Sequence, residues 1–159
     1  MVWSLLVWLL AFVLQAGLLG RCMYGLISLS DLEQDFLNPL DLSRKLNAFV
    51  WLEYSAQFVV AAILVGTAKW VAGGLHVAIT AYMVHLYLKG HVYIDATDAF
   101  RQLKQQKFRR GLLFGAYCLS FVFLTYRLIE TAIHTTLTPE GRETAKKLFK
   151  DAAASLHGY

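Results

Sequence analysis

The sequence contains little charge and little cysteine, and each shortage excludes a class of protein. Only 16% of its 159 residues are charged, whereas 57% are hydrophobic, a balance too apolar for a soluble domain of this length. The two cysteines, Cys22 and Cys118, lie at or inside apolar stretches, which predicts buried small side chains rather than a disulfide framework. The apolar runs are continuous instead of alternating, so we expect membrane-spanning helices and not a β-barrel.

Patterns typical of enzymes and metal sites are also missing. His76, His85 and His91 form neither an H-x-x-x-H nor an H-E-x-x-H pair, and we interpret them as interfacial or core histidines. No cluster of Ser, Cys or Asp resembles a nucleophile with its base. The net charge of +4 lies in loops, without the interleaved aromatic and basic residues of a nucleic-acid site. We therefore predict no enzymatic activity, no metal or other cofactor and no nucleic-acid partner.

Four apolar runs are long enough to cross a bilayer as helices. The predicted spans cover about residues 2–20, 48–68, 71–88 and 111–133. In the first, Trp3 and Trp8 lie near one end and Arg21 follows the other, which favours an N-terminus in the lumen. A cleaved signal peptide is the competing interpretation, but the basic start and the small-residue cleavage site that it requires are missing.

The second and third spans form a predicted hairpin. Lys69 and the Gly73-Gly74 pair indicate a tight break between them, and one long tilted span is the alternative. A three-span topology, with the C-terminal tail in the cytosol, remains the second choice. We divide the chain into a membrane domain over residues 1–134 and a polar tail over 135–159. The tail is predicted to be helical, with Thr138 as N-cap and Pro139 at the first position.

Two polar segments separate the spans at the predicted cytosolic side. In the first, residues 28–47, Ser28 or Ser30 is a candidate N-cap and leucines recur at helical spacing. This pattern predicts a short amphipathic helix at the membrane interface, broken by Pro39, with an ordinary loop as the alternative. The second segment, residues 89–110, carries six of the fifteen basic residues. Four of these are predicted to contact anionic lipid head groups: Lys104, Lys107, Arg109 and Arg110.

The charge distribution orients the chain. Residues 21–47 and 89–110 together hold nine Lys and Arg, whereas the turn between the second and third spans holds only Lys69. Because basic residues in short loops collect on the cytosolic side, both polar segments are predicted to be cytosolic. The tail after residue 134 then lies in the lumen although it carries four further basic residues.

Several short motifs, in order along the chain, resemble the cornichon family. They are LSDLEQDFLNP followed by LN, LEYS at residues 52–55, AFRQL at 99–103 and SFVFLTYRLI at 120–129, and the resemblance extends over about residues 1–134. It implies a cargo receptor that selects integral membrane proteins in the endoplasmic reticulum, links them to the COPII coat and cycles to the Golgi in transport vesicles. Some animal relatives also remain with glutamate receptors as auxiliary subunits. The identity of the cargo and assembly into a homo-oligomer remain open.

The resemblance also implies a coat-binding site for the cargo-adaptor subunit of COPII. The family's motif is an aliphatic residue followed by Phe-Arg-Thr-Leu; here Phe100, Arg101 and Leu103 match, whereas Ala99 and Gln102 depart. Phe100 and Leu103 are three residues apart, so on a helix we expect them to share a face that enters an apolar groove. The alternative is that both residues dock on the membrane interface.

A receptor for membrane proteins must recognise their spans inside the bilayer. Polar side chains mark such contacts, and Glu53, Tyr54 and Gln57 form one polar corner of the second span. We predict that these three residues bind cargo; the alternative is that Glu53 only caps the start of the helix. A small transporter or channel subunit is the rival hypothesis, with Glu53, Arg127 and Glu130 along a path. Inverted repeats and helices broken by Gly or Pro, typical of carriers, are absent from the sequence.

Overall fold

The structure is a computed structural model that describes residues 2–157. Six helices follow one another: α1 (Val2–Glu33), α2 (Pro39–Asn47), α3 (Val50–Gly66), α4 (Trp70–Leu88), α5 (Ala99–Leu137) and α6 (Pro139–His157). Within residues 2–157 there is no strand, and four helical segments are long and apolar enough to cross a membrane. The predicted all-α fold with four spans is confirmed.

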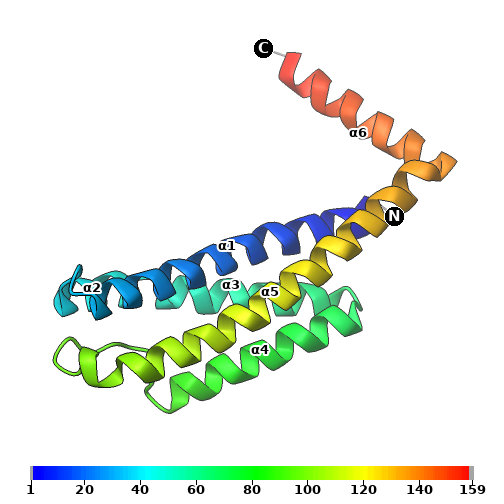
Figure 1. Cartoon of the computed structure of the whole chain (residues 1–159). Coiled ribbons are helices and arrows are strands. Elements are labelled where there is room, and N and C mark those ends of the chain that lie inside the picture. Colours follow the sequence, from blue (N-terminus) through cyan, green and yellow to red (C-terminus); the bar gives the residue numbers. More distant parts are fainter. Residues whose placement is uncertain (1, 158–159) are drawn as a thin grey trace.

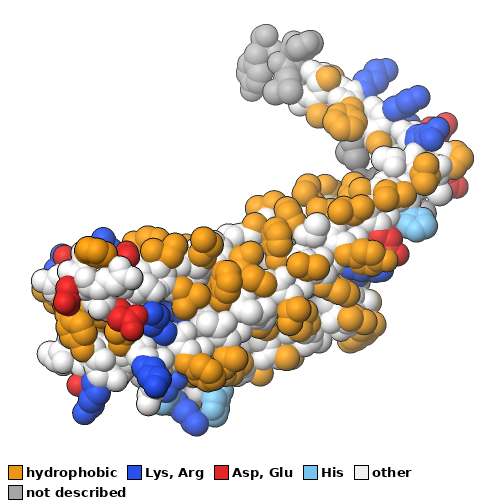
Figure 2. Space-filling view, in the orientation of Figure 1, with side chains coloured by type: hydrophobic (Ala, Val, Ile, Leu, Met, Phe, Trp, Pro, Cys, Tyr) orange, Lys and Arg blue, Asp and Glu red, His pale blue; other side chains and the backbone are white. Residues whose placement is uncertain are grey.

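The spans form a bundle with two layers (Figure 1). The long helices α1 and α5 pack side by side, and α3 and α4 form a hairpin in which α3 packs on α1 and α4 packs on α5. The short helix α2 lies at one end of the bundle, which we call the α2 end, and α6 projects from the other, the α6 end. The core contains one inward stripe from each span, with Trp8, Val60, Met83 and Tyr117 as members. Figure 2 shows charged side chains gathered at the two ends and hydrophobic ones over the length between them.

Helices α1 and α5 are longer than the bilayer requires. At roughly 1.5 Å per residue, their 32 and 39 residues extend about 48 Å and about 58 Å, against roughly 30 Å of hydrocarbon. α1 continues through Ser28 and Ser30 to Glu33, so the prediction of a helix start at either serine is wrong. The chain turns only at residues 34–38, where Asp35 adopts a left-handed conformation with φ 59°. The later half of the second polar segment likewise belongs to α5.

A short amphipathic helix, α2, does follow the first span, but it is not the predicted stretch: the residues before Pro39 end α1 and form a turn, and Pro39 begins α2 instead of breaking a helix. The Oδ1 atom of Asn38 accepts a hydrogen bond from the backbone N–H of Leu40 at 3.0 Å. Proline is favoured in the first turn because its missing N–H would lack a partner there. The apolar side of α2 packs on the ends of α1 and α5 in a second core, which we call the α2-end cluster: Leu29, Leu32, Leu42, Leu46, Ile94, Ala99 and Leu103.

The break between α3 and α4 lies at Thr67–Lys69 and not at the glycine pair, which corrects the sequence prediction. Ala68 has φ 55°, and the N–H of Lys69 bonds back to the carbonyl of Leu64 at 2.9 Å. Gly73 lies inside α4, where a Cβ atom would be 3.0 Å from Cγ2 of Val65 and 3.3 Å from its backbone nitrogen. The glycine therefore serves the close approach of two helices, as small residues do between membrane spans.

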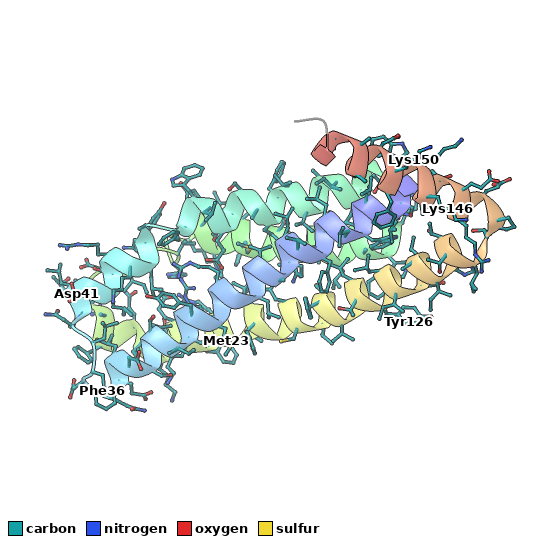
Figure 3. All side chains as sticks on the ribbon, turned by 90° about the horizontal axis from the view of Figure 1, so that it is seen from above. Met23, Phe36, Asp41, Tyr126, Lys146 and Lys150 are labelled. Atoms are coloured by element: carbon teal, nitrogen blue, oxygen red, sulfur yellow. The ribbon has the colours of Figure 1, made fainter. Side chains whose placement is uncertain are left out.

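The tail forms the predicted helix α6. Pro139 is its first residue, and the carbonyl of Thr138 accepts the N–H of Arg142 at 3.1 Å. In the view from above (Figure 3), Lys146 and Lys150 lie on this helix at one end of the molecule, and Phe36 and Asp41 lie at the other.

Candidate functional site

The first turn of α5 exposes part of the coat-binding motif and buries the rest. Phe100 has 56% of its surface exposed, whereas Leu103 has only 8% and belongs to the α2-end cluster with Ala99. The expectation that Phe100 and Leu103 share an exposed face is therefore wrong. The inward stripe of α5 instead follows Ala99, Leu103, Gln106 and Arg110, which are three or four residues apart and so lie on one side of a helix.

Arg101 and the preceding loop fix how this turn is presented. The guanidinium of Arg101 pairs with the carboxylate of Asp98 at 2.6 Å. Asn47 and Ile94 exchange two hydrogen bonds of 2.9 Å, which tie the loop to α2. Asp95 accepts bonds from the N–H and hydroxyl of Thr97, and these bonds lower the pKa of that carboxyl. Because the folded-state pKa is depressed, the small stabilisation of this turn is present above the unfolded-state pKa of Asp95 and is lost as the pH falls.

The four basic residues predicted to bind lipid have different surroundings. Lys104 is exposed, and Lys107 pairs with Glu33 of α1. Arg109 is half-buried and donates to Gln105 at 3.4 Å. Arg110 is buried inside the bundle, which corrects its assignment as a lipid contact: its guanidinium occupies the space that a Cβ atom on Gly25 would fill.

A group of charges lies between α1, α3 and α5 near the α2 end. Glu53 has 7% of its surface exposed, and both Glu53 and Arg110 interact electrostatically with Arg21. Arg21 donates to the carbonyls of Lys45 and Leu46 at the end of α2, at 3.4 and 3.2 Å. We call Arg21, Glu53 and Arg110 the charge cluster. Sequence reasoning used Arg21 and Arg110 only for topology and lipid binding, because nothing in the local pattern brings three helices together.

The predicted cargo-binding corner faces inward. Gln57, with 1% of its surface exposed, donates to the carbonyl of His76 at 3.1 Å and to Oγ1 of Thr80 at 3.3 Å. Since Glu53 is also buried, direct cargo contact by Glu53 and Gln57 is wrong for this structure. Tyr54 is half-buried, and its hydroxyl donates to the carbonyl of Met83 at 2.8 Å. The polar corner therefore joins α3 to α4.

The charges proposed for a transport path are divided between the two ends of the bundle. Arg127 pairs with Glu130 at 2.5 Å and lies over the ring of Trp8, near the N-terminus of α1. Glu53 belongs to the charge cluster near the α2 end. The three charges assigned to the rival transporter hypothesis therefore do not gather in one site.

The outer side of the α3–α4 hairpin is hollowed, and we call this surface the α3–α4 groove. Its main part has a volume of about 420 Å³ and is lined by Phe58, Ala61, Ala62, Val65, Val77, Thr80, Ala81 and Val84. A neighbouring hollow of about 150 Å³ shares Val84 and includes Trp51, Tyr54 and Tyr87. Tyr54 is thus the one predicted cargo-binding residue that reaches this outer surface.

These features define a small helical, multi-pass membrane protein with an apolar groove along two spans and an exposed aromatic residue at its charged end. The family model described as Cornichon protein matches residues 5–126. The chain belongs to the cornichon family, as its motifs predicted.

Relatives from plants and yeast cover most of the chain. Protein cornichon homolog 2 of Oryza sativa subsp. japonica is 35% identical over 130 residues, which cover 82% of this chain and 87% of the relative. Protein cornichon homolog 3 of Arabidopsis thaliana is 36% identical, with coverage of 78% and 88%. The ER-derived vesicles protein ERV15 of Saccharomyces cerevisiae is 32% identical, with coverage of 71% and 84%. No solved structure matches the chain.

Cornichon proteins are cargo receptors of the endoplasmic reticulum membrane that leave it in transport vesicles, and this protein is one of them. Membership of the family does not by itself locate the surfaces that bind the cargo and the export machinery.

Proposed function

We propose that this protein works as a cargo receptor through two separate surfaces. The α3–α4 groove packs against a span of an integral membrane cargo, and the first turn of α5 binds the cargo-adaptor subunit of the COPII coat. The observation that carries this proposal is the exposure of Phe100 at the charged end of the bundle, away from the apolar groove. A large apolar side chain held out beside Arg101 suits a protein groove with an acidic rim.

The coat can reach Phe100 only if the α2 end is cytosolic. The nine Lys and Arg of the two polar segments, against Lys69 alone in the α3–α4 turn, support that orientation. It leaves the N-terminus and the tail of residues 135–159 in the lumen, with residues 1–134 as the membrane domain. Lys104, Lys107 and Arg109 then lie on the side where anionic lipids are abundant and can add electrostatic attraction to the membrane surface.

Cysteine labelling in sealed endoplasmic reticulum vesicles tests the orientation. A single reporter cysteine replaces Gln105 or Ser155, both exposed, in a background without Cys22 and Cys118. A membrane-impermeant maleimide should label the Gln105→Cys protein from outside and the Ser155→Cys protein only after the vesicles are permeabilised. Protection of the cysteine at 105 would remove the coat contact, whereas labelling at both positions would place the tail in the cytosol.

The α3–α4 groove has the features of a surface for another span. Spans associate by close packing, which small side chains permit, and Ala61, Ala62 and Ala81 line the groove between larger walls. Inside the hairpin, Gln57 bonds to His76 and Thr80. The buried polar corner therefore sets the separation of α3 and α4, and with it the width of the groove, without touching the cargo.

Filling the groove should abolish cargo binding without unfolding the protein. Ala62→Phe and Ala81→Phe each add a large apolar side chain at an exposed position, and we expect cargo co-purification to fall about tenfold, the equivalent of roughly 1.4 kcal/mol. Val122→Phe is the control, because Val122 is also exposed, but on α5 and outside the groove. If both groove variants recover cargo as well as the control does, the cargo binds another face.

A further inference from the structure

The α6 end of the bundle contains a pocket that the proposed receptor surfaces do not use. It has a volume of about 530 Å³. Trp8 of α1, the first turn of α4 with Lys69 before it, and Phe123, Tyr126 and Arg127 of α5 form its walls. We call it the Trp8 pocket. Figure 3 shows Tyr126 on the part of α5 that leads toward α6.

Two cations flank the indole ring at the base of this pocket. The ammonium nitrogen of Lys69 is 5.3 Å from the ring centroid of Trp8, and the guanidinium carbon of Arg127 is 5.5 Å from it. Lys69 donates to the hydroxyl of Ser4 at 2.8 Å, a neutral acceptor, whereas Arg127 is balanced by Glu130. Together these three ionised groups leave one net positive charge at the pocket.

Two further parts of the walls carry N–H donors: the indole of Trp8 and the start of α4. Trp8 has only 2% of its surface exposed, and its Nε1–H has no acceptor within residues 2–157. The nitrogen itself is sealed from the surface, so a ligand in the pocket does not reach this donor. The helix α4 begins in the same wall without a side-chain cap, so its N-terminus adds partial positive charge. The two cations and the helix N-terminus together fit an anion.

We propose that the Trp8 pocket binds the phosphodiester group of a membrane phospholipid, with an acyl chain lying along Phe123 and the apolar surface of α5. The singly charged phosphodiester complements the one net positive charge, and its oxygens can accept hydrogen bonds from the ammonium of Lys69 and the guanidinium of Arg127. Val71 and Phe123 give the pocket apolar walls, which a lipid chain uses and a dissolved anion does not. Trp70 and Tyr126 are exposed at its rim, as aromatic residues are at head-group depth.

The test is lipid retention by the purified full-length protein in detergent, measured by native mass spectrometry. Dioleoylphosphatidylglycerol and dioleoylphosphatidylcholine share the phosphodiester, so we expect one molecule of either to be retained. Dioleoylglycerol has the same chains without phosphate and should not be retained. Inorganic phosphate, which tests for a dissolved anion, should neither displace the lipid nor raise the melting temperature.

Charge removal in the pocket should weaken retention about tenfold. The double variant Lys69→Gln with Arg127→Gln removes both cations, and the control Lys146→Gln with Lys150→Gln removes two exposed cations from α6. The single variant Lys69→Gln removes the cation that has no acidic partner and leaves the pair of Arg127 and Glu130 intact, so it provides a second measurement if the double variant does not fold. Equal retention of the phospholipid by the wild type, the double variant and Lys69→Gln would overturn the proposal. Retention of dioleoylglycerol at the same level as the phospholipids would also overturn the proposal. So would displacement of the bound phospholipid by a membrane-spanning peptide that ends in a glutamate, because the pocket would then bind a protein carboxylate.

Discussion

Replacing Phe100 with alanine is expected to hold the protein in the endoplasmic reticulum while leaving it folded. Phe100 is exposed and belongs to neither core, so its removal creates no cavity. A large aromatic side chain at the centre of an interface commonly contributes 2 kcal/mol or more, which corresponds to roughly a thirtyfold loss of affinity. The fraction of protein recovered in vesicles budded from isolated membranes should therefore fall by at least about tenfold, with an unchanged melting temperature.

Two matched variants separate coat binding from folding. Leu103→Ala leaves a cavity in the α2-end cluster, and it should lower stability by about 2–4 kcal/mol. That variant is expected to show both a lower melting temperature and retention. Phe108→Ala removes another exposed aromatic residue of α5 and should exit normally. Normal exit of the Phe100→Ala protein would mean that this turn is not the coat contact.

Replacing Glu53 with alanine is expected to destabilise the bundle instead of acting specifically on cargo. Glu53 is the buried acidic member of the charge cluster, and without it Arg21 and Arg110 confront each other with no opposite charge between the helices. Removing one side of a buried charge arrangement typically costs 3–5 kcal/mol. We expect a loss of about 3 kcal/mol, at the lower end of this range, because Glu53 makes no ion pair within 4.0 Å with the other described residues. The ion pairs found within residues 2–157 all involve other residues. The melting temperature in detergent micelles measures this loss.

A second substitution checks the cause. Arg110→Met removes one of the two cations, so the double variant Glu53→Ala with Arg110→Met should recover part of the stability lost by Glu53→Ala alone. Glu53→Gln keeps the shape of the side chain but not its charge, and it should resemble Glu53→Ala. A Glu53→Ala protein with wild-type stability and reduced cargo recovery would instead support direct cargo contact.

The helix ends show how much local signals decide. In the sequence, Pro39 is compatible both with the end of a helix and with the first residue of the next one. The structure shows that it is the first residue of α2. Gly73 carries the same ambiguity, since glycine suits both a turn and a close helix contact. In the structure the turn forms at Ala68, which has a positive φ, and Gly73 lies inside α4 where that helix approaches Val65.

Four spans, a charged end and membership of the cornichon family follow from the amino-acid sequence alone, because span length, net apolarity and motif order are local properties of the chain. Which side of each helix faces the interior does not follow from it. In water the apolar side of a helix is the buried side, but in a bilayer both lipid and core accept apolar residues. Only the packing of four helices therefore decided that Glu53, Gln57, Leu103 and Arg110 lie inside while Phe100 lies outside. It also brought Trp8, Lys69 and Arg127 together from three parts of the chain.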